Sequence, residues 1–114
     1  LELGANDGLR GQPLDLMRRN LEAMIQACRR AGARVLLVGM RLPPNYGRDY
    51  TEKFHQTFID VARRHKVPVV PFLFDGFADN RAYFQPDAVH PTAHAQPLML
   101  ATVWPVLRPV LAAR

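Results

Sequence analysis

Two short motifs near opposite ends of the chain contain residue types that take part in proton transfer and oxyanion stabilisation. One of them is residues 87–91, Asp-Ala-Val-His-Pro. On a tight turn, the Asp87 carboxylate could contact Nδ1 of His90, which would orient the ring and leave Nε2 free to take a proton from a hydroxyl group. The alternative is that Asp87 caps the following turn and that His90 has no chemical role.

The other motif is residues 4–8, Gly-Ala-Asn-Asp-Gly, which directly follow Leu-Glu-Leu. A side-chain amide placed just after a strand could donate a hydrogen bond to a developing oxyanion, and Asn6 is in such a place. Gly4 and Gly8 would permit the tight turn that presents it. An ordinary Asn-Asp-Gly turn explains the same residues without any chemistry.

The chain contains no serine, and no other residue is an obvious substitute nucleophile. Cys28 lies on an apolar helical stripe and is expected to be a buried thiol, and Thr92 is expected to be a helix N-cap. His90 and His94 could share a metal with Asp87. However, a zinc site needs three or four ligands, and Pro91 places His90 outside the following helix or in its first turn, so we expect no metal site.

The residues between the two motifs alternate between strand-like and helix-like patterns. Residues 1–4, 35–38 and 67–72 are apolar runs typical of strands, and two prolines in the last run favour an edge position. Helices are predicted from Pro13 to Gly32, over residues 50–62, and from Thr92 toward Leu111. Pro97, Pro105 and Pro109 predict that the last helix is broken or kinked, and Trp104 is expected in the core.

This order predicts an α/β fold of three layers, flavodoxin-like or doubly wound, with a parallel sheet. Three strands would make an unusually small sheet of this kind. The chain also begins with Leu1 in what is already a predicted strand. We therefore expect residues 1–114 to be the C-terminal part of a single domain whose first strands lie upstream.

Composition excludes several classes of function. The net charge is +5, but the basic residues are dispersed along predicted helices and have no aromatic residues between them, so we expect no nucleic-acid partner. No apolar run approaches the ~18–20 residues of a membrane helix, so stable membrane insertion is not expected. A single cysteine cannot form an internal disulfide.

The motifs resemble those of a known family. Residues 3–8 resemble the third sequence block of the SGNH (GDSL) hydrolases, and residues 87–91 resemble their fifth block, whose Asp-x-x-His supplies two triad members. Residues 6–11 and 41–47 resemble segments of the bacterial thioesterase I, lysophospholipase and arylesterase branch. The resemblance covers blocks three to five and nearly the whole chain, although Ala5 stands where a glycine is common.

The resemblance implies a role for each matching residue. Asn6 would be an oxyanion-hole donor, Asp87 the orienting acid and His90 the general base. The nucleophilic serine of a Gly-Asp-Ser block would lie upstream, so this chain alone should not turn over esters. Residues 7–13 resemble a loop that moves over bound acyl chains. An acyl groove would then be lined by Leu9, Leu42, Pro43 and Tyr46. Ordinary packing of the loops explains these four residues equally well.

The resemblance further implies a hydrolase of acyl esters, thioesters or lysophospholipids that works through an acyl-enzyme, without metal or cofactor. Its partners would be a small-molecule substrate and its own N-terminal segment, and it would be periplasmic or secreted. Two alternatives stay open. One is a non-catalytic module of this fold that binds a lipid, a glycan or a protein, and the other is a fragment complemented by a second chain that carries the serine.

Overall fold

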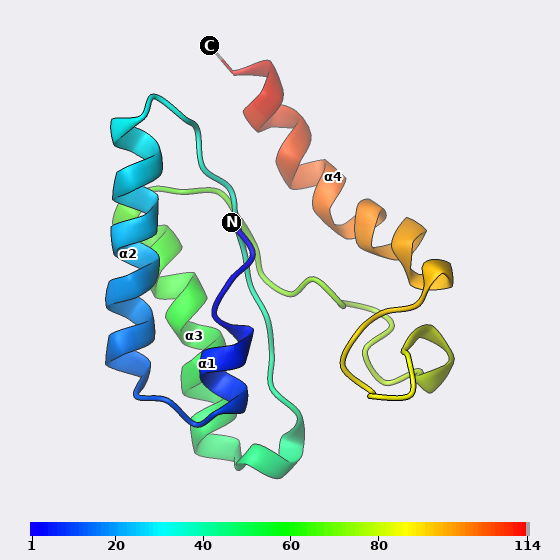
Figure 1. The fold of residues 1–114 in the computed structure, drawn as a ribbon. Coiled ribbons are helices and arrows are strands. Elements are labelled where there is room, and N and C mark those ends of the chain that lie inside the picture. The colour runs from blue at the N-terminus through cyan, green and yellow to red at the C-terminus, as the bar shows by residue number, and fades with distance from the viewer. Residues whose placement is uncertain (114) are drawn as a thin grey trace. The chain divides into compact units, whose positions relative to one another are not determined.

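The structure is a computed structural model that describes residues 1–113. The chain forms two compact units, Leu1–Phe72 and residues 73 onward, and each is described by itself (Figure 1). The first unit contains the parallel strands and the two long helices predicted from the sequence. The second contains the Asp87–His90 motif and the last helix.

The strands of the first unit form a small parallel ladder. β1 (Leu37–Val38) pairs with β2 (Val69–Val70), with Leu37 opposite Val69. Leu1 binds the other side of β1, because its amino group donates to Leu36 O at 2.7 Å and its carbonyl accepts from Val38 N at 2.9 Å. Residues 1–4 are not assigned as a strand, but Leu1 makes the contacts of a neighbouring parallel strand. Within residues 1–113, β1 is therefore paired on both sides and β2 on one side only, which agrees with the edge position that the prolines flanking β2 predicted.

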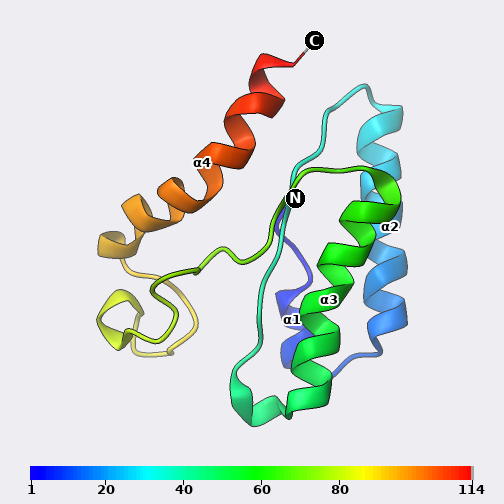
Figure 2. The same cartoon turned by 180° about the vertical axis from the view of Figure 1, so that it is seen from behind.

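Two amphipathic helices lie side by side on one side of these strands in both views (Figures 1 and 2). They are α2 (Leu14–Arg30) and α3 (Arg48–His65), which confirms the two predicted helical stripes. Gly32, with φ of +81°, follows the end of α2. The fully buried side chains include Met17, Leu21, Ile25, Leu37, Phe54, Phe58, Val61 and Val70. Burial of each such large apolar side chain contributes about 1.5–3 kcal/mol, so this cluster is the core of the unit.

A short helix that the sequence did not predict carries Asn6. It is α1 (Ala5–Leu9), and it begins after Gly4, whose φ of +108° favours glycine. Between β1 and α3, the predicted loop contains the 3₁₀ turn η1 (Pro44–Tyr46). η1 follows β1, and α1 follows the residues that pair with β1, and α/β folds place functional groups after their strands.

The second unit consists of a loop, two 3₁₀ turns and a long helix. They are η2 (Arg81–Tyr83), η3 (Ala93–Ala95) and α4 (Gln96–Ala112). The last helix was predicted to be broken or kinked, and the break is wrong, since α4 continues without interruption through Pro105 and Pro109; the kink stays a prediction. Pro97 lies in the first turn, where its missing N–H costs nothing. The expectation for Trp104 is also wrong, because this residue is 44% exposed. Within residues 1–113, no helix is long and apolar enough to cross a membrane.

Candidate functional site

The Asp87–His90 motif lies on a tight turn closed by backbone hydrogen bonds. Gln85 N donates to His90 O at 2.8 Å, and Ala88 N donates to Gln85 O at 2.8 Å. Phe84 and Pro91 form an antiparallel bridge at the base of the turn. Ala88 has φ of +61°, in the left-handed region that non-glycine residues rarely occupy. The turn therefore holds one strained residue between the two candidate catalytic side chains.

The Asp87 carboxylate uses its two oxygens for different tasks. Oδ2 accepts a hydrogen bond from Nδ1 of His90 at 2.6 Å. Oδ1 accepts from the backbone N–H groups of Val89 and His90, at 2.9 and 3.0 Å. The imidazole contact, followed by these two backbone bonds, holds the pKa of Asp87 well below its usual value. One carboxylate therefore both caps the turn and contacts the imidazole, and the chemical role of His90 stays a prediction.

The second nitrogen of His90 is left available. The His90 side chain is 71% exposed, and within residues 1–113 its Nε2 forms no hydrogen bond. Because Nδ1 faces a carboxylate it carries the proton, so the neutral ring presents the Nε2 lone pair outward. Thr92 lies at the N-cap position of η3, as predicted, but its buried hydroxyl has no partner among the described residues.

Asn6 is the second residue of α1 in the first unit. Its side chain is exposed, and its amide makes no hydrogen bond to any described residue, so both N–H groups are free to donate. Gly8 supports the helix in a way that sequence reasoning did not foresee. A Cβ at Gly8 would lie 2.4 Å from Cε2 of Phe54 and 2.8 Å from Cδ2 of Leu42. Gly8 is therefore needed for close packing against α3.

The structure brings Asp87 and His90 together within the second unit, whereas Asn6 belongs to the first. The four groove residues also belong to the first unit, and their substrate role stays a prediction. Leu42 is buried and lines a shallow hollow of about 200 Å³, together with Arg41, Pro44, Arg48, Thr51 and Glu52. Leu9, Pro43 and Tyr46 are not part of its lining. The contact of Leu42 with the Gly8 position gives this residue a packing role in any case.

The rival sites found in the sequence gain no support. Across residues 1–113, no three His, Cys, Asp or Glu side chains are grouped so that they could hold a metal ion. Cys28 was expected to be a buried thiol, but its side chain on α2 is only half-buried. Sequence reasoning also missed Tyr50, whose hydroxyl donates to Gln12 O at 2.7 Å. The only hint in the sequence that Tyr50 packs toward the rest of the unit was its place at the start of the apolar stripe of α3.

Comparison with known proteins gives the family. The family model described as the GDSL-like Lipase/Acylhydrolase family matches residues 1–96. The chain belongs to this family. Among curated relatives, Esterase TesA of Pseudomonas aeruginosa is 45% identical over 111 residues, which cover 97% of this chain and 55% of that protein. Thioesterase 1/protease 1/lysophospholipase L1 of Escherichia coli strain K12 is 35% identical, over 97% of this chain and 53% of its own length.

Solved structures of the family agree with the fold. A crystal structure of TesA matches with a TM-score of 0.90 at 44% identity, over 95% of this chain and 60% of that one. The psychrotrophic esterase EstA from Pseudoalteromonas sp., inhibited by monoethylphosphonate, matches with a TM-score of 0.87 at 32% identity, over 97% and 61%. The predicted α/β fold of the SGNH type is therefore confirmed. This chain spans between half and two thirds of the length of these relatives.

Proposed function

We propose that the protein carrying this chain is a serine esterase or thioesterase that cleaves acyl esters, thioesters or lysophospholipids. The observation that carries the proposal is the 2.6 Å contact between Asp87 and Nδ1 of His90, with Nε2 left open. Names such as esterase, arylesterase and thioesterase among the relatives support the reaction class. The substrate would be a small molecule, and a periplasmic or secreted location is part of the proposal.

In the proposed mechanism, Nε2 of His90 takes the proton of a serine hydroxyl as its oxygen attacks the acyl carbonyl carbon. Asp87 stabilises the imidazolium that forms. The carbonyl electrons move to oxygen, where the Asn6 amide donates a hydrogen bond. The imidazolium then protonates the leaving alcohol or thiol, and water attacks the acyl-enzyme by the same route. The serine is proposed to lie upstream of residue 1, since these 114 residues contain none.

The proposal is tested on the protein expressed from its natural reading frame. We expect a fluorophosphonate probe to add once, to a serine, in a protein whose intact mass exceeds 12.9 kDa. A protein of 12.9 kDa that takes no label and hydrolyses no ester would contradict the proposal. Such a result would instead favour a non-catalytic binding module or a fragment complemented by another chain.

Asn6→Ala tests the oxyanion role within that protein. Removing one donor should lower kcat for ester hydrolysis by about 100-fold or more, with little change in KM, because the hydrogen bond strengthens as charge develops on the oxygen. Steady-state kinetics on a soluble ester gives both constants. An effect confined to KM would show that Asn6 binds the ground state and is not an oxyanion donor.

A further inference from the structure

Three residues of α3 face three positions of the segment that carries Asn6, and both sets are spaced four residues apart. A Cβ at Gly4 would lie 3.4 Å from Cζ of Phe58, and one at Gly8 would lie 2.4 Å from Cε2 of Phe54. At the third position, the Tyr50 hydroxyl donates to the carbonyl of Gln12 at 2.7 Å. The two segments therefore run past each other with a matched register.

Two of these three contacts are rigid apolar packing. Residues four apart lie on the same face of a helix, so Tyr50, Phe54 and Phe58 form one row along α3. Phe54 and Phe58 are fully buried and meet edge to face, with ring centroids 5.3 Å apart. The backbone at Gly4 and Gly8 packs directly against these two rings. Asn6 lies between the two glycine contacts, with its side chain exposed.

The third contact holds the residues that follow α1. Gln12 N donates to Asp7 O at 2.9 Å, while Arg10 N donates to Asn6 O at 3.0 Å. The chain thus folds back on α1, and Gln12 is bound on both sides, by α1 through its N–H and by Tyr50 through its carbonyl. Without the Tyr50 hydroxyl, the turn after Asn6 would lose this bond to α3.

The Tyr50 hydroxyl is a reliable donor. Burial, and then the negative charge of Asp7, raise the pKa of Tyr50 above its ordinary value of 10.0. The phenol therefore keeps its proton throughout the neutral and mildly alkaline range. A carbonyl oxygen needs that proton, so Tyr50 can donate to Gln12 throughout this range.

We propose that Tyr50 is a positioning residue, which holds the turn after α1 against α3 and thereby aims the Asn6 amide. This inference rests on the proposed oxyanion role of Asn6. Tyr50 touches no reacting atom, so its removal should affect catalysis only through Asn6.

The test is Tyr50→Phe in the protein expressed from its natural reading frame, which keeps the ring and removes the hydroxyl. We expect kcat for ester hydrolysis to fall about 3- to 10-fold, with KM nearly unchanged. The matched control is Thr57→Val, which removes a hydroxyl from the same helix. The Thr57 hydroxyl donates to Lys53 O within α3, and it makes no hydrogen bond to the described residues of the Asn6 segment. This control should retain the parent kcat.

The double variant Asn6→Ala/Tyr50→Phe separates positioning from general destabilisation. If Tyr50 acts through Asn6, its removal should cause no further loss of kcat in the Asn6→Ala background. An equal further loss in that background would overturn the positioning role. An unchanged kcat in Tyr50→Phe, together with a lowered kcat in Asn6→Ala, would also overturn the positioning role. That result would leave the oxyanion role of Asn6 intact. If Asn6→Ala itself keeps full kcat, the oxyanion role falls and the positioning role falls with it.

Discussion

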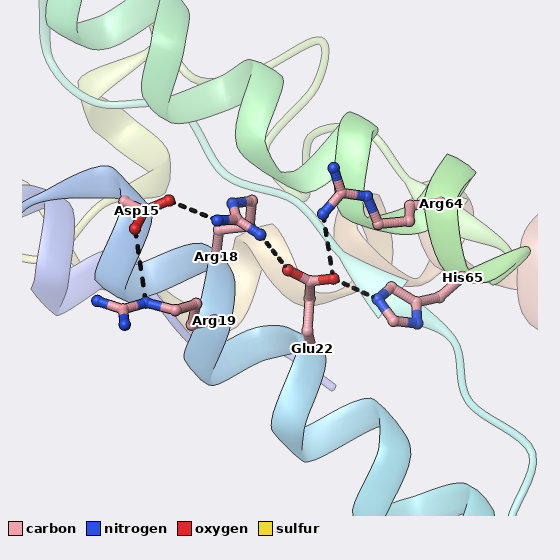
Figure 3. Close-up of polar contacts among 6 residues, drawn as sticks. All are labelled: Asp15, Arg18, Arg19, Glu22, Arg64 and His65. Atoms are coloured by element: carbon pink, nitrogen blue, oxygen red, sulfur yellow. Dashed lines mark hydrogen bonds and ion pairs between the residues drawn. The ribbon is translucent and has the colours of Figure 1, made fainter.

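Residues 1–113 contain two histidine–carboxylate pairs at the same 2.6 Å distance, and they are built in opposite ways. Asp87 and His90 are three residues apart on one turn, with side chains 46% and 71% exposed. Glu22 and His65 are 43 residues apart and connect α2 to α3, with side chains only 15% and 14% exposed (Figure 3). One pair is local and open to solvent, whereas the other is formed by packing and enclosed.

The nitrogen that each ring uses separates the pairs further. His90 binds its carboxylate through Nδ1 and keeps Nε2 free, whereas His65 binds Glu22 through Nε2. The carboxylates differ as well. Asp87 completes its hydrogen bonds with backbone N–H groups, whereas Glu22 binds Arg18 at 2.6 Å and Arg64 at 3.5 Å. The 2.6 Å distance is therefore common to both pairs, and what differs is the ring nitrogen that binds the carboxylate and the exposure of the side chains.

The same difference appears in what lowers each carboxyl pKa. For Glu22 the main cause is the hydrogen bond from His65, followed among the lowering contacts by Arg18. Arg18 also binds Asp15, so the enclosed pair is part of a network of ion pairs on α2 (Figure 3). For Asp87 the causes are His90 and the turn backbone. The enclosed pair connects two helices, and the open pair orients one ring.

Exchanging each histidine for alanine is the strongest test of this comparison. In the protein expressed from its natural reading frame, His90→Ala should lower kcat for ester hydrolysis by about 1,000-fold or more, because the general base is lost. His65→Ala should retain the parent kcat and instead unfold at a lower urea concentration. Steady-state kinetics and urea unfolding of both variants measure this. Near-normal turnover in His90→Ala would remove the difference between the two pairs.

Glu22→Gln tests the enclosed pair through pH. Because the pKa of Glu22 is lowered from 4.5 in the folded protein, its ionised contacts stabilise the fold above that pH and are lost as the pH falls below it. The variant should lower the free energy of unfolding by about 1–2 kcal/mol at neutral pH, and the difference from the parent should shrink below about pH 4.5. Urea unfolding at pH 7 and pH 3 gives both values. A difference independent of pH would rule out the ion-pair contribution.

Ala88→Gly has the smallest expected effect and tests the strain in the open pair. Glycine adopts the left-handed conformation of residue 88 at little steric cost, so the variant should be more stable by up to about 1 kcal/mol. Ala93→Gly is the control, because Ala93 begins η3 without a positive φ and glycine there should be destabilising. Thermal unfolding compares the two. A destabilised Ala88→Gly would mean that the turn carries no strain.

The sequence by itself determined the local features. The spacing of Asp87 and His90 showed that their side chains could meet, because three residues on a tight turn can bring them together, although it left the simple turn cap open. The stripes of α2 and α3 were readable because one helix turn repeats every 3.6 residues along the chain. The family resemblance through Asn6 and residues 87–91 predicted the fold.

Features that join distant residues were decided by the tertiary structure. Glu22 with His65 and Gln12 with Tyr50 lie 43 and 38 residues apart, and no local pattern reports the register in which two helices or a loop and a helix pack. The contacts of Gly8 belong to the same class, since a glycine shows its packing role only against its neighbour. In α4, the apolar pattern predicted that Trp104 is buried, but this residue is exposed. The pattern shows which side chains share one face of the helix, and it does not show whether another element packs on that face. A hydrogen bond acts over about 3 Å, so the packing of the core had to be known before these bonds could be assigned.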